Sequence, residues 1–181
     1  MPPILSGNSA FARKSMERET PMHVQIFSCG GTIDKVYFDA TSEYEVGEPR
    51  IVEIFRRANV SFEYSIISLM RKDSLDMTDE DRALIRSRID ASEHQRFLIT
   101  HGTDTMPETA QVLSALSDKT IVLTGSMTPA RFEASDAEFN IGCAVGALQG
   151  HKPGVYIAMN GCVFSAGHVR KNREAGRFEW I

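Results

Sequence analysis

The chain has little cysteine, no long apolar run and no excess of positive charge. Only three of its 181 residues are cysteine, which argues against the disulfide framework of a secreted domain. No apolar run reaches the roughly 18 residues expected of a membrane-spanning helix. Lysine and arginine total 20 against 24 aspartates and glutamates, a formal charge of −4. We therefore expect neither nucleic acid nor a membrane as a partner.

What remains is the composition of an ordinary globular domain. Hydrophobic residues make up 42% and charged residues 24% of the chain, which excludes wholesale disorder. Residues 1–21 lack the apolar core of a secretory signal peptide and are predicted to form a weakly ordered arm before a single domain, 22–181. Together with the scarcity of cysteine, this predicts a cytoplasmic protein in which Cys29, Cys143 and Cys162 are buried free thiols.

Short apolar segments alternate with amphipathic ones along the domain. We expect strands at 23–28, 60–68, 96–100, 120–124 and 154–160, and helices at 49–58, from Thr78, at 105–116 and at 135–149. The alternation predicts an α/β fold, a three-layer open and mainly parallel sheet with helices on both faces, of Rossmann or flavodoxin type.

Three details of the helices are also predicted. Thr78–Asp81 and Thr105–Glu108 have the pattern of capping boxes, and Pro49 stands where a proline opens a helix. Glycines at 142, 146 and 150 follow one another at four-residue spacing in the last helix. This spacing predicts close packing of the helix on the sheet or on another subunit.

The ends of the predicted strands carry small hydroxyl residues beside glycine or a carboxylate. Gly30–Asp34, His101–Met106 and Gly125–Pro129 each follow a strand, and Lys72–Asp76 precedes a helix. Because the carboxyl ends of parallel strands form one edge of a sheet, we expect these segments to meet there. Hydroxyls, carboxylates and glycine amides suit a small polar zwitterion or an acyl-transfer reaction.

Each of these motifs also has a purely structural interpretation. Asp104–Thr105 would serve as a helix cap, and Gly30–Gly31 as a tight turn. The glycines lack the spacing of a dinucleotide or phosphate-binding loop, so nucleotide binding is poorly supported. His101 and His168 are interpreted as structural histidines, since no third metal ligand lies at a suitable spacing. The basic segment 170–177 is interpreted as a solvated face.

Two segments, Gly30–Ile33 and Ile99–Met106, resemble the paired signatures of bacterial-type L-asparaginases. Further matches follow in the same order, at Glu43–Gly47, Asp73–Thr78, Leu123–Met127, Phe139–Asn140 and His168–Lys171. The resemblance extends from Val24 to about Phe178. The chain is most similar to the short, single-domain members of that family and to the N-terminal domain of the longer ones.

The resemblance implies hydrolysis of L-asparagine to L-aspartate and ammonia through an acyl-enzyme, without a metal or cofactor. Thr32 resembles the nucleophile and Tyr44 its activating partner. Thr103, Asp104 and Lys171 resemble a second triad, in which the Lys–Asp pair polarises the Thr103 hydroxyl. In this interpretation Thr32 attacks the substrate and Thr103 aligns or activates the water that releases the product.

The resemblance also implies a pocket for a small amino acid substrate. Ser74 and Asp104 resemble the residues that hold its α-carboxylate and α-amino groups, and Ser126 falls where a backbone carbonyl contacts the side-chain amide. The residues implied to contact the substrate are Gly31, Ser74, Leu75, Gly102, Thr103, Asp104 and Ser126. Leu75 replaces a residue that is polar in many relatives, and Thr128 replaces an arginine, so substrate preference stays open.

Longer members of the family carry a second domain that helps to close the active site of a neighbouring subunit. A homo-oligomer, either a dimer or a tetramer, is therefore expected. Two alternatives to an asparaginase stay open. One is a glutaminase or another ω-amide amidohydrolase, including the amidotransferase subunit that acts with tRNA. The other is a non-catalytic module that binds an amino acid.

Overall fold

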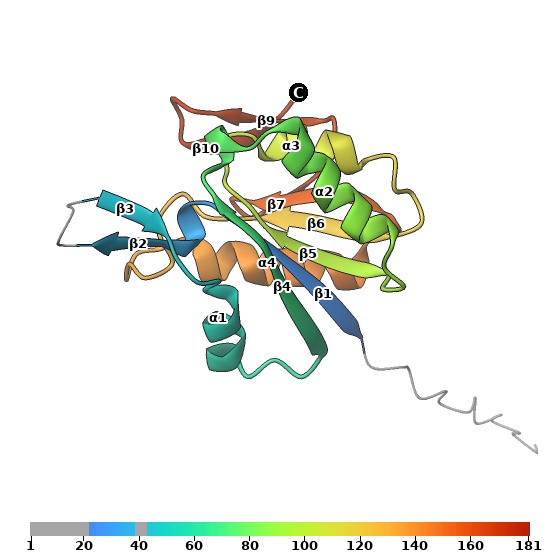
Figure 1. The fold of residues 1–181 in the computed structure, drawn as a ribbon, viewed down its shortest axis with the longest axis horizontal. Helices are drawn as coiled ribbons and strands as arrows, with labels where there is room; N and C mark the ends of the chain where they lie inside the picture. Colours follow the sequence, from blue (N-terminus) through green and yellow to red (C-terminus); the bar gives the residue numbers. More distant parts are fainter. Residues whose placement is uncertain (1–21, 39–42) are drawn as a thin grey trace, which may run out of the picture.

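The computed structural model describes residues 22–38 and 43–181 (Figure 1), without the side chains of Tyr37, Phe38, Glu43 and Tyr44. The predicted arm, 1–21, lies outside the described residues. The elements in chain order are β1 (His23–Gly30), η1 (Thr32–Asp34), β2 (Lys35–Phe38), β3 (Glu43–Val46), α1 (Ile51–Ala58), β4 (Glu63–Lys72), η2 (Ser74–Asp76), α2 (Asp79–Asp90), β5 (Arg96–Thr100), α3 (Met106–Leu113), β6 (Thr120–Thr124), α4 (Ala137–Gly150), β7 (Gly154–Met159), β8 (Cys162–Ser165), β9 (Val169–Asn172) and β10 (Arg177–Trp180).

The main sheet has six strands in the order β4-β1-β5-β6-β7-β8. All neighbouring pairs are parallel except the last, in which β8 returns antiparallel to β7. From β1 the chain moves first to β4 on one side and then to β5 on the other, so the strand order reverses between β1 and β5. Such a switch point is where open α/β sheets bind ligands.

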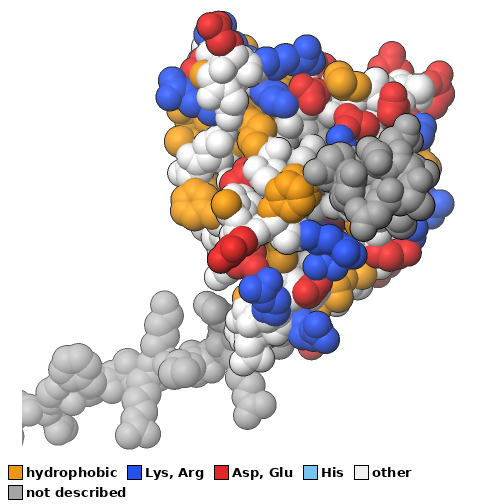
Figure 2. Space-filling view, turned by 90° about the vertical axis from the view of Figure 1, so that its left-hand side faces the viewer, with side chains coloured by type: hydrophobic (Ala, Val, Ile, Leu, Met, Phe, Trp, Pro, Cys, Tyr) orange, Lys and Arg blue, Asp and Glu red, His pale blue; other side chains and the backbone are white. Residues whose placement is uncertain are grey.

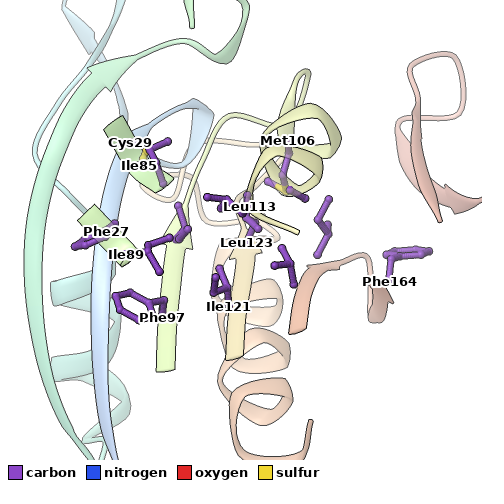
Figure 3. Close-up of a cluster of buried hydrophobic side chains, with 14 of the residues drawn as sticks. Phe27, Cys29, Ile85, Ile89, Phe97, Met106, Leu113, Ile121, Leu123 and Phe164 are labelled. Carbon is purple, nitrogen blue, oxygen red and sulfur yellow. The ribbon is translucent and has the colours of Figure 1, made fainter. Parts of the chain in front are cut away.

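Helices cover both faces of this sheet, which confirms the three-layer α/β prediction (Figure 1). Side chains along each buried strand alternate between two cores. In β5, Phe97 and Ile99 join the core beneath α2 and α3, while Leu98 joins the core beneath α1 and α4. Figure 3 shows the first core, where Ile89 of α2 lies near Phe97 and Ile85 of α2 lies near Cys29 of β1.

The central strands were predicted best. The ranges 96–100 and 120–124 are confirmed to the residue as β5 and β6. The strand expected last, 154–160, is β7, but three further strands follow it. Each of β8, β9 and β10 has four residues and one buried side chain, so none carries the apolar run on which the prediction depended.

Two of the three predictions about helix starts were wrong. The capping box at Thr78 is confirmed, with Asp81 as its second member. The Thr105 hydroxyl caps nothing, because it donates to the carbonyl of Ser74 at 2.7 Å. Pro49 does not open α1, which begins at Ile51 after Arg50.

The glycine stripe of α4 does not pack against the sheet. A Cβ placed on Gly142, Gly146 or Gly150 would meet nothing within 4 Å. The stripe therefore lies on the open side of the helix, and its contact with a second subunit stays a prediction. The buried-thiol interpretation holds for Cys29, whereas Cys143 is half-buried and Cys162 is exposed. Within the described ranges, no helix is long and apolar enough to cross a membrane.

Candidate active site

The turns after β1 and β5 lie against each other at the switch point. Gly30 and Gly31 have φ values of +87° and +89°, a region that favours glycine. A Cβ on Gly31 would lie 2.5 Å from Gly102 Cα, far inside contact distance. Only a glycine fits there, and the close approach brings together the segments that carry Thr32 and Thr103.

Three residues of the predicted second triad are in contact. The Lys171 Nζ donates to Thr103 Oγ1 at 2.8 Å and to Asp104 Oδ1 at 3.0 Å. Lys171 comes from β9, more than sixty residues further along the chain, and its side chain is 13% exposed. Thr103 is 4% exposed, so the ammonium and this hydroxyl interact largely out of water. The protonated lysine donates here and polarises the hydroxyl oxygen.

Asp104 has a second cationic partner that sequence reasoning missed. The Arg173 Nε lies 3.2 Å from Asp104 Oδ1, the same oxygen that Lys171 contacts. Arg173 is the first residue of the turn between β9 and β10. Period-two alternation along a strand places it on the same side as Lys171. Because Arg173 comes two positions after Lys171, the sequence could have indicated that both side chains lie on the same side.

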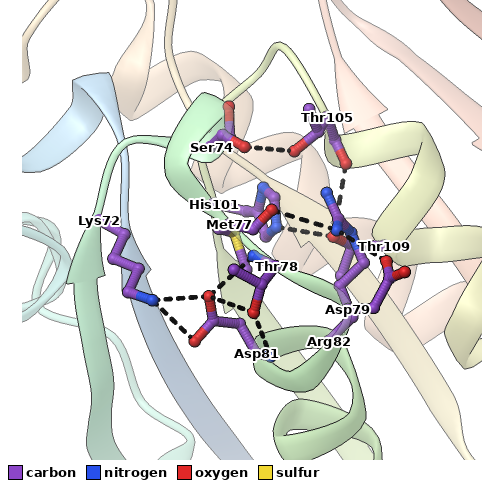
Figure 4. Close-up of polar contacts among 10 residues, drawn as sticks. All are labelled: Lys72, Ser74, Met77, Thr78, Asp79, Asp81, Arg82, His101, Thr105 and Thr109. Atoms are coloured by element: carbon purple, nitrogen blue, oxygen red, sulfur yellow. Dashed lines mark hydrogen bonds and ion pairs between the residues drawn. The ribbon is translucent and has the colours of Figure 1, made fainter.

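Ser74 joins the β4 end to the β5 turn. Its Oγ accepts from the Asp104 backbone N–H at 3.1 Å, and its carbonyl accepts from Thr105. Figure 4 shows this contact above the Thr78–Asp81 capping box, where Lys72 Nζ pairs with the Asp81 carboxylate at 2.7 Å. Ser74 is 1% exposed, so its hydroxyl is held firmly beside Asp104.

Asp34 holds in place the turn after β1 that carries Thr32. The Asp34 carboxylate accepts from Ser28 Oγ at 3.2 Å and from the Arg50 N–H at 2.8 Å. Burial is the main cause that raises the pKa of Asp34 from 3.8 to about 6, and the two hydrogen bonds partly offset it. Thr32 itself is half-buried, and no partner is recorded for its hydroxyl among the described residues.

His101 fits the structural interpretation. Its ring is fully buried, and burial lowers its pKa to about 4, so the ring is neutral. Nδ1 lies 2.6 Å from the Gly102 carbonyl and Nε2 lies 2.9 Å from Thr109 Oγ1. A proton on Nδ1 satisfies both contacts. His168 is exposed, and no side-chain hydrogen bond is recorded for it among the described residues, so its structural interpretation stays a prediction.

The remaining predicted site residues differ in accessibility. Ser126 is fully buried, and its hydroxyl donates to the Thr128 carbonyl at 2.5 Å. Leu75 is 64% exposed beside Ser74. The Tyr44 backbone pairs with that of Tyr37 in the β2–β3 hairpin, but its side chain lies outside the described part of the chain.

Sequence reasoning gave no role to the side chains that support the Ser126 loop. The Asp136 carboxylate accepts from the backbone N–H groups of Met127 and Thr128 at 3.0–3.1 Å. The buried Asn140 amide donates to the Gly125 carbonyl at 3.1 Å, and its oxygen accepts from the Asn160 N–H at 3.1 Å. The loop after β6 is therefore tied to α4.

A cleft of about 690 Å³ opens beside Lys171 and Asp104. Its lining comes from the start of α3 and from the β9 region, and comprises Asp104, Pro107, Glu108, Gln111, Gly167, Val169, Arg170, Lys171, Arg173 and Ile181. The parallel strands point their carboxyl ends toward the left of Figure 1, and Figure 2 faces that side. Charges of both signs are interspersed there, as expected for a site that binds a small polar molecule. Over the described residues, no group of three or more His, Cys, Asp or Glu side chains is placed to hold a metal ion.

The fold and the site define an α/β protein with a buried Thr–Lys–Asp cluster at the switch point of its sheet. Residues 23–178 match the model of the asparaginase N-terminal domain. The chain therefore belongs to the asparaginase family.

The relatives of this chain are named for different activities. The chain is 32% identical over 164 residues to the "Probable L-asparaginase periplasmic" of Haemophilus influenzae, covering 82% of this chain and 46% of the relative. It is 31% identical over 179 residues to a glutamyl-tRNA(Gln) amidotransferase subunit of Archaeoglobus fulgidus, covering 90% and 42%. The chain thus spans less than half the length of these relatives.

A solved structure agrees with the fold. The thermostable L-asparaginase from Thermococcus kodakarensis superimposes with a TM-score of 0.76 at 26% identity. The match covers 88% of this chain and 51% of that one. The described architecture is therefore that of about half of a longer relative.

Proposed function

We propose that this chain hydrolyses the side-chain amide of L-asparagine, giving L-aspartate and ammonia. The observation that carries the proposal is the contact of Lys171 Nζ with Thr103 Oγ1 at 2.8 Å and with Asp104 Oδ1 at 3.0 Å. Thr103 and Asp104 lie on the turn whose Gly102 packs against Gly31, and Thr32 is the residue after Gly31. The proposal uses both threonine hydroxyls, the Lys171 ammonium and the Asp104 carboxylate.

In the first half-reaction, Thr32 Oγ1 attacks the amide carbon and a C–O bond forms. Its proton passes to Tyr44, the partner that we assign to it, and from there to the leaving nitrogen. The C–N bond breaks, ammonia departs, and a β-aspartyl ester remains on Thr32. A threonine hydroxyl needs such a proton acceptor because it is a poor nucleophile at neutral pH.

In the second half-reaction, a water molecule hydrolyses the ester. The Lys171 ammonium polarises Thr103, and the Thr103 hydroxyl aligns this water on the ester carbon. The water's hydroxyl bonds to that carbon, its proton returns to Thr32 Oγ1, and aspartate leaves. Asp104 balances the charge of Lys171 at 3.0 Å, so the ammonium is stable in this little-exposed position.

The substrate's charged ends are assigned to the neighbouring side chains. In our proposal, the α-amino group meets the Asp104 carboxylate and the α-carboxylate meets Ser74. The amide nitrogen contacts the Ser126 carbonyl. Gly31 and Gly102 allow the turn after β1, the turn after β5 and Ser74 to pack closely at the site. Leu75 provides an apolar edge that is 64% exposed.

Glutamine is the second candidate substrate, since one relative is named as an amidotransferase subunit for glutamyl-tRNA(Gln). Leu75, at the rim of the site, is apolar. It therefore offers no hydrogen bond by which the site could distinguish the side chain of asparagine from the longer one of glutamine. Binding of an amino acid without turnover is the remaining alternative. The retained contact between Lys171 and Thr103 at 2.8 Å favours catalysis over it.

The test is ammonia release from L-asparagine, L-glutamine and other ω-amides by pure protein from a host lacking its own asparaginases. We expect turnover of asparagine, and loss of it in Thr32→Ala and Lys171→Met. Lys152→Met is the matched control for Lys171→Met, because Lys152 is exposed and does not line the cleft. No turnover of any amide by the wild type contradicts the proposal, and saturable aspartate binding without turnover would identify a binding module.

We further propose that the protein is cytoplasmic and forms a homo-oligomer with a small-molecule substrate as its other partner. The location rests on the small number of cysteines, although one relative is named as periplasmic. Cell fractionation tests the location. Light scattering at several concentrations tests the assembly, and a fully active monomer would contradict it.

A further inference from the structure

Arg173 is the one member of the basic segment 170–177, besides Lys171, that contacts the Thr–Lys–Asp cluster in the described structure. Its Nε lies 3.2 Å from Asp104 Oδ1. Arg170 and Arg177 instead pair with Glu179, on the other side of the hairpin. Asp104 therefore carries two cations on one oxygen, Lys171 and Arg173.

We propose that Arg173 widens the substrate class of the site, so that ω-amides of dicarboxylic acids without a free α-ammonium group are bound and hydrolysed beside asparagine. This rests on the proposed function, in which Asp104 receives that ammonium. A carboxylate already paired with two cations offers less attraction to a third. Asparagine stays a substrate, because an exposed arginine side chain can be displaced from its partner.

The solvent exposure of the Arg173–Asp104 ion pair limits how strongly this pair can change the affinity for a ligand. The Arg173 side chain is 67% exposed and that of Asp104 is 27% exposed, while Lys171 is 13% exposed. Lys171 is thus the permanent partner and Arg173 the displaceable one. An exposed ion pair is worth about 1 kcal/mol or less, so displacing Arg173 costs an ammonium ligand up to about fivefold in affinity.

The rest of the guanidinium favours an anionic ligand. Arg173 is one of the residues that line the 690 Å³ cleft, and in the part of the chain that is described Asp104 is its only recorded partner. Guanidinium N–H groups match the geometry of a carboxylate. A ligand without the α-ammonium group therefore gains a contact between its carboxylate and Arg173. The ammonium group of a free amino acid is instead repelled by Arg173.

The test compares L-aspartate with succinate, two ligands that differ only by the α-ammonium group. Calorimetry gives the ratio of their dissociation constants for the wild type, Arg173→Gln and Arg170→Gln. Arg170 lines the same cleft but pairs with Glu179, so it controls for the loss of one charge. Because the readout is a ratio within one variant, partial misfolding lowers both affinities and leaves it unchanged.

We expect the wild type to bind both ligands. Arg173→Gln should shift the ratio of their dissociation constants toward aspartate by about fivefold, and Arg170→Gln by less than about twofold. An unchanged ratio in Arg173→Gln, an equal shift in Arg170→Gln, or no binding of either ligand overturns the inference.

Turnover separates this inference from the proposed function. The wild type should hydrolyse succinamate as well as asparagine, and Arg173→Gln should lower kcat/KM for succinamate relative to that for asparagine by about fivefold. If asparagine is hydrolysed and the preference does not move, the proposed function stands and the role of Arg173 falls. If the binding ratio shifts as expected but no amide is hydrolysed, the role of Arg173 stands and the hydrolase falls.

Discussion

Lys171 lies 2.8 Å from the hydroxyl oxygen of Thr103, although 68 positions separate the two residues in the sequence. The β9–β10 hairpin delivers the lysine and the turn after β5 delivers the threonine. No local pattern links two such positions. The contact is therefore a product of the tertiary fold, and the proposed chemistry depends on it.

Removing the Lys171 ammonium should abolish most of the turnover. For Lys171→Met we expect kcat for asparagine to fall by about 10²-fold or more, since a donor that polarises a reacting group contributes about that factor. The KM should change less, because Asp104 keeps Arg173 as a partner. Ammonia release measures both constants, and Lys152→Met, an exposed lysine on the connection before β7, is the control. Equal activity of the two variants would contradict the assignment.

Two glycine-to-alanine changes should act in opposite directions. Gly31→Ala places a Cβ 2.5 Å from Gly102 Cα at a φ of +89°, so it should lower the free energy of unfolding by about 2 kcal/mol or more. Gly146→Ala adds a methyl to an open helix face where nothing lies within 4 Å. It should stabilise the protein by about 0.5–1 kcal/mol. Urea unfolding measures both, and a destabilised Gly146→Ala would mean that this face is covered.

Asp34 should make stability depend on pH. Folding raises its pKa from 3.8 to about 6, so protonation favours the folded state. Its contribution is fully present below about pH 4 and is lost as the pH rises through 6, a change of about 2–3 kcal/mol. The neutral variant Asp34→Asn should therefore gain stability over the wild type between about pH 4 and pH 7.

The measurement for Asp34 is urea unfolding of both proteins across that pH range. Asp90→Asn removes the same charge from an exposed position at the end of α2 and is the matched control. A difference between Asp34→Asn and the wild type that stays constant with pH would contradict the raised pKa of Asp34.

Asn140 should stabilise the fold more than most polar residues do. Asn140→Leu removes bonds to the Gly125 carbonyl, the Asp136 carboxylate and the Asn160 N–H. Leaving the Gly125 carbonyl, on a buried residue, without this partner and losing the other two bonds should cost about 2–4 kcal/mol in the free energy of unfolding. Gln149→Leu, on the exposed side of the same helix, should change it by less than about 0.5 kcal/mol. Similar losses in both variants would refute the role of Asn140.

The sheet and the grouping of its loops could be predicted from the sequence. Strands β5 and β6 are continuous apolar runs, such as Phe97–Ile99, because both faces of a parallel sheet are buried. The rule that parallel strands end at one edge then placed Thr32 beside Thr103 without further information. Thr78 was also predictable, since a capping box is local in sequence.

Features that depend on distant partners were not predictable in the same way. Thr105 resembles a helix cap, but the Ser74 carbonyl, 31 residues away, takes its hydroxyl. Arg173 looked like part of a solvated basic face, and only the position of Asp104 gives it a contact. The four-residue strands after β7 have too few buried side chains to show a period.

The most direct test of the account is to identify the threonine that carries the acyl group. Lys171→Met and the wild type are mixed with asparagine, quenched in acid, and mapped by peptide mass spectrometry. The account predicts a β-aspartyl group on the peptide that contains Thr32, at higher occupancy in Lys171→Met because Thr103 no longer aligns the water. An acyl group on Thr103, or ammonia release with no acylated threonine, would contradict it.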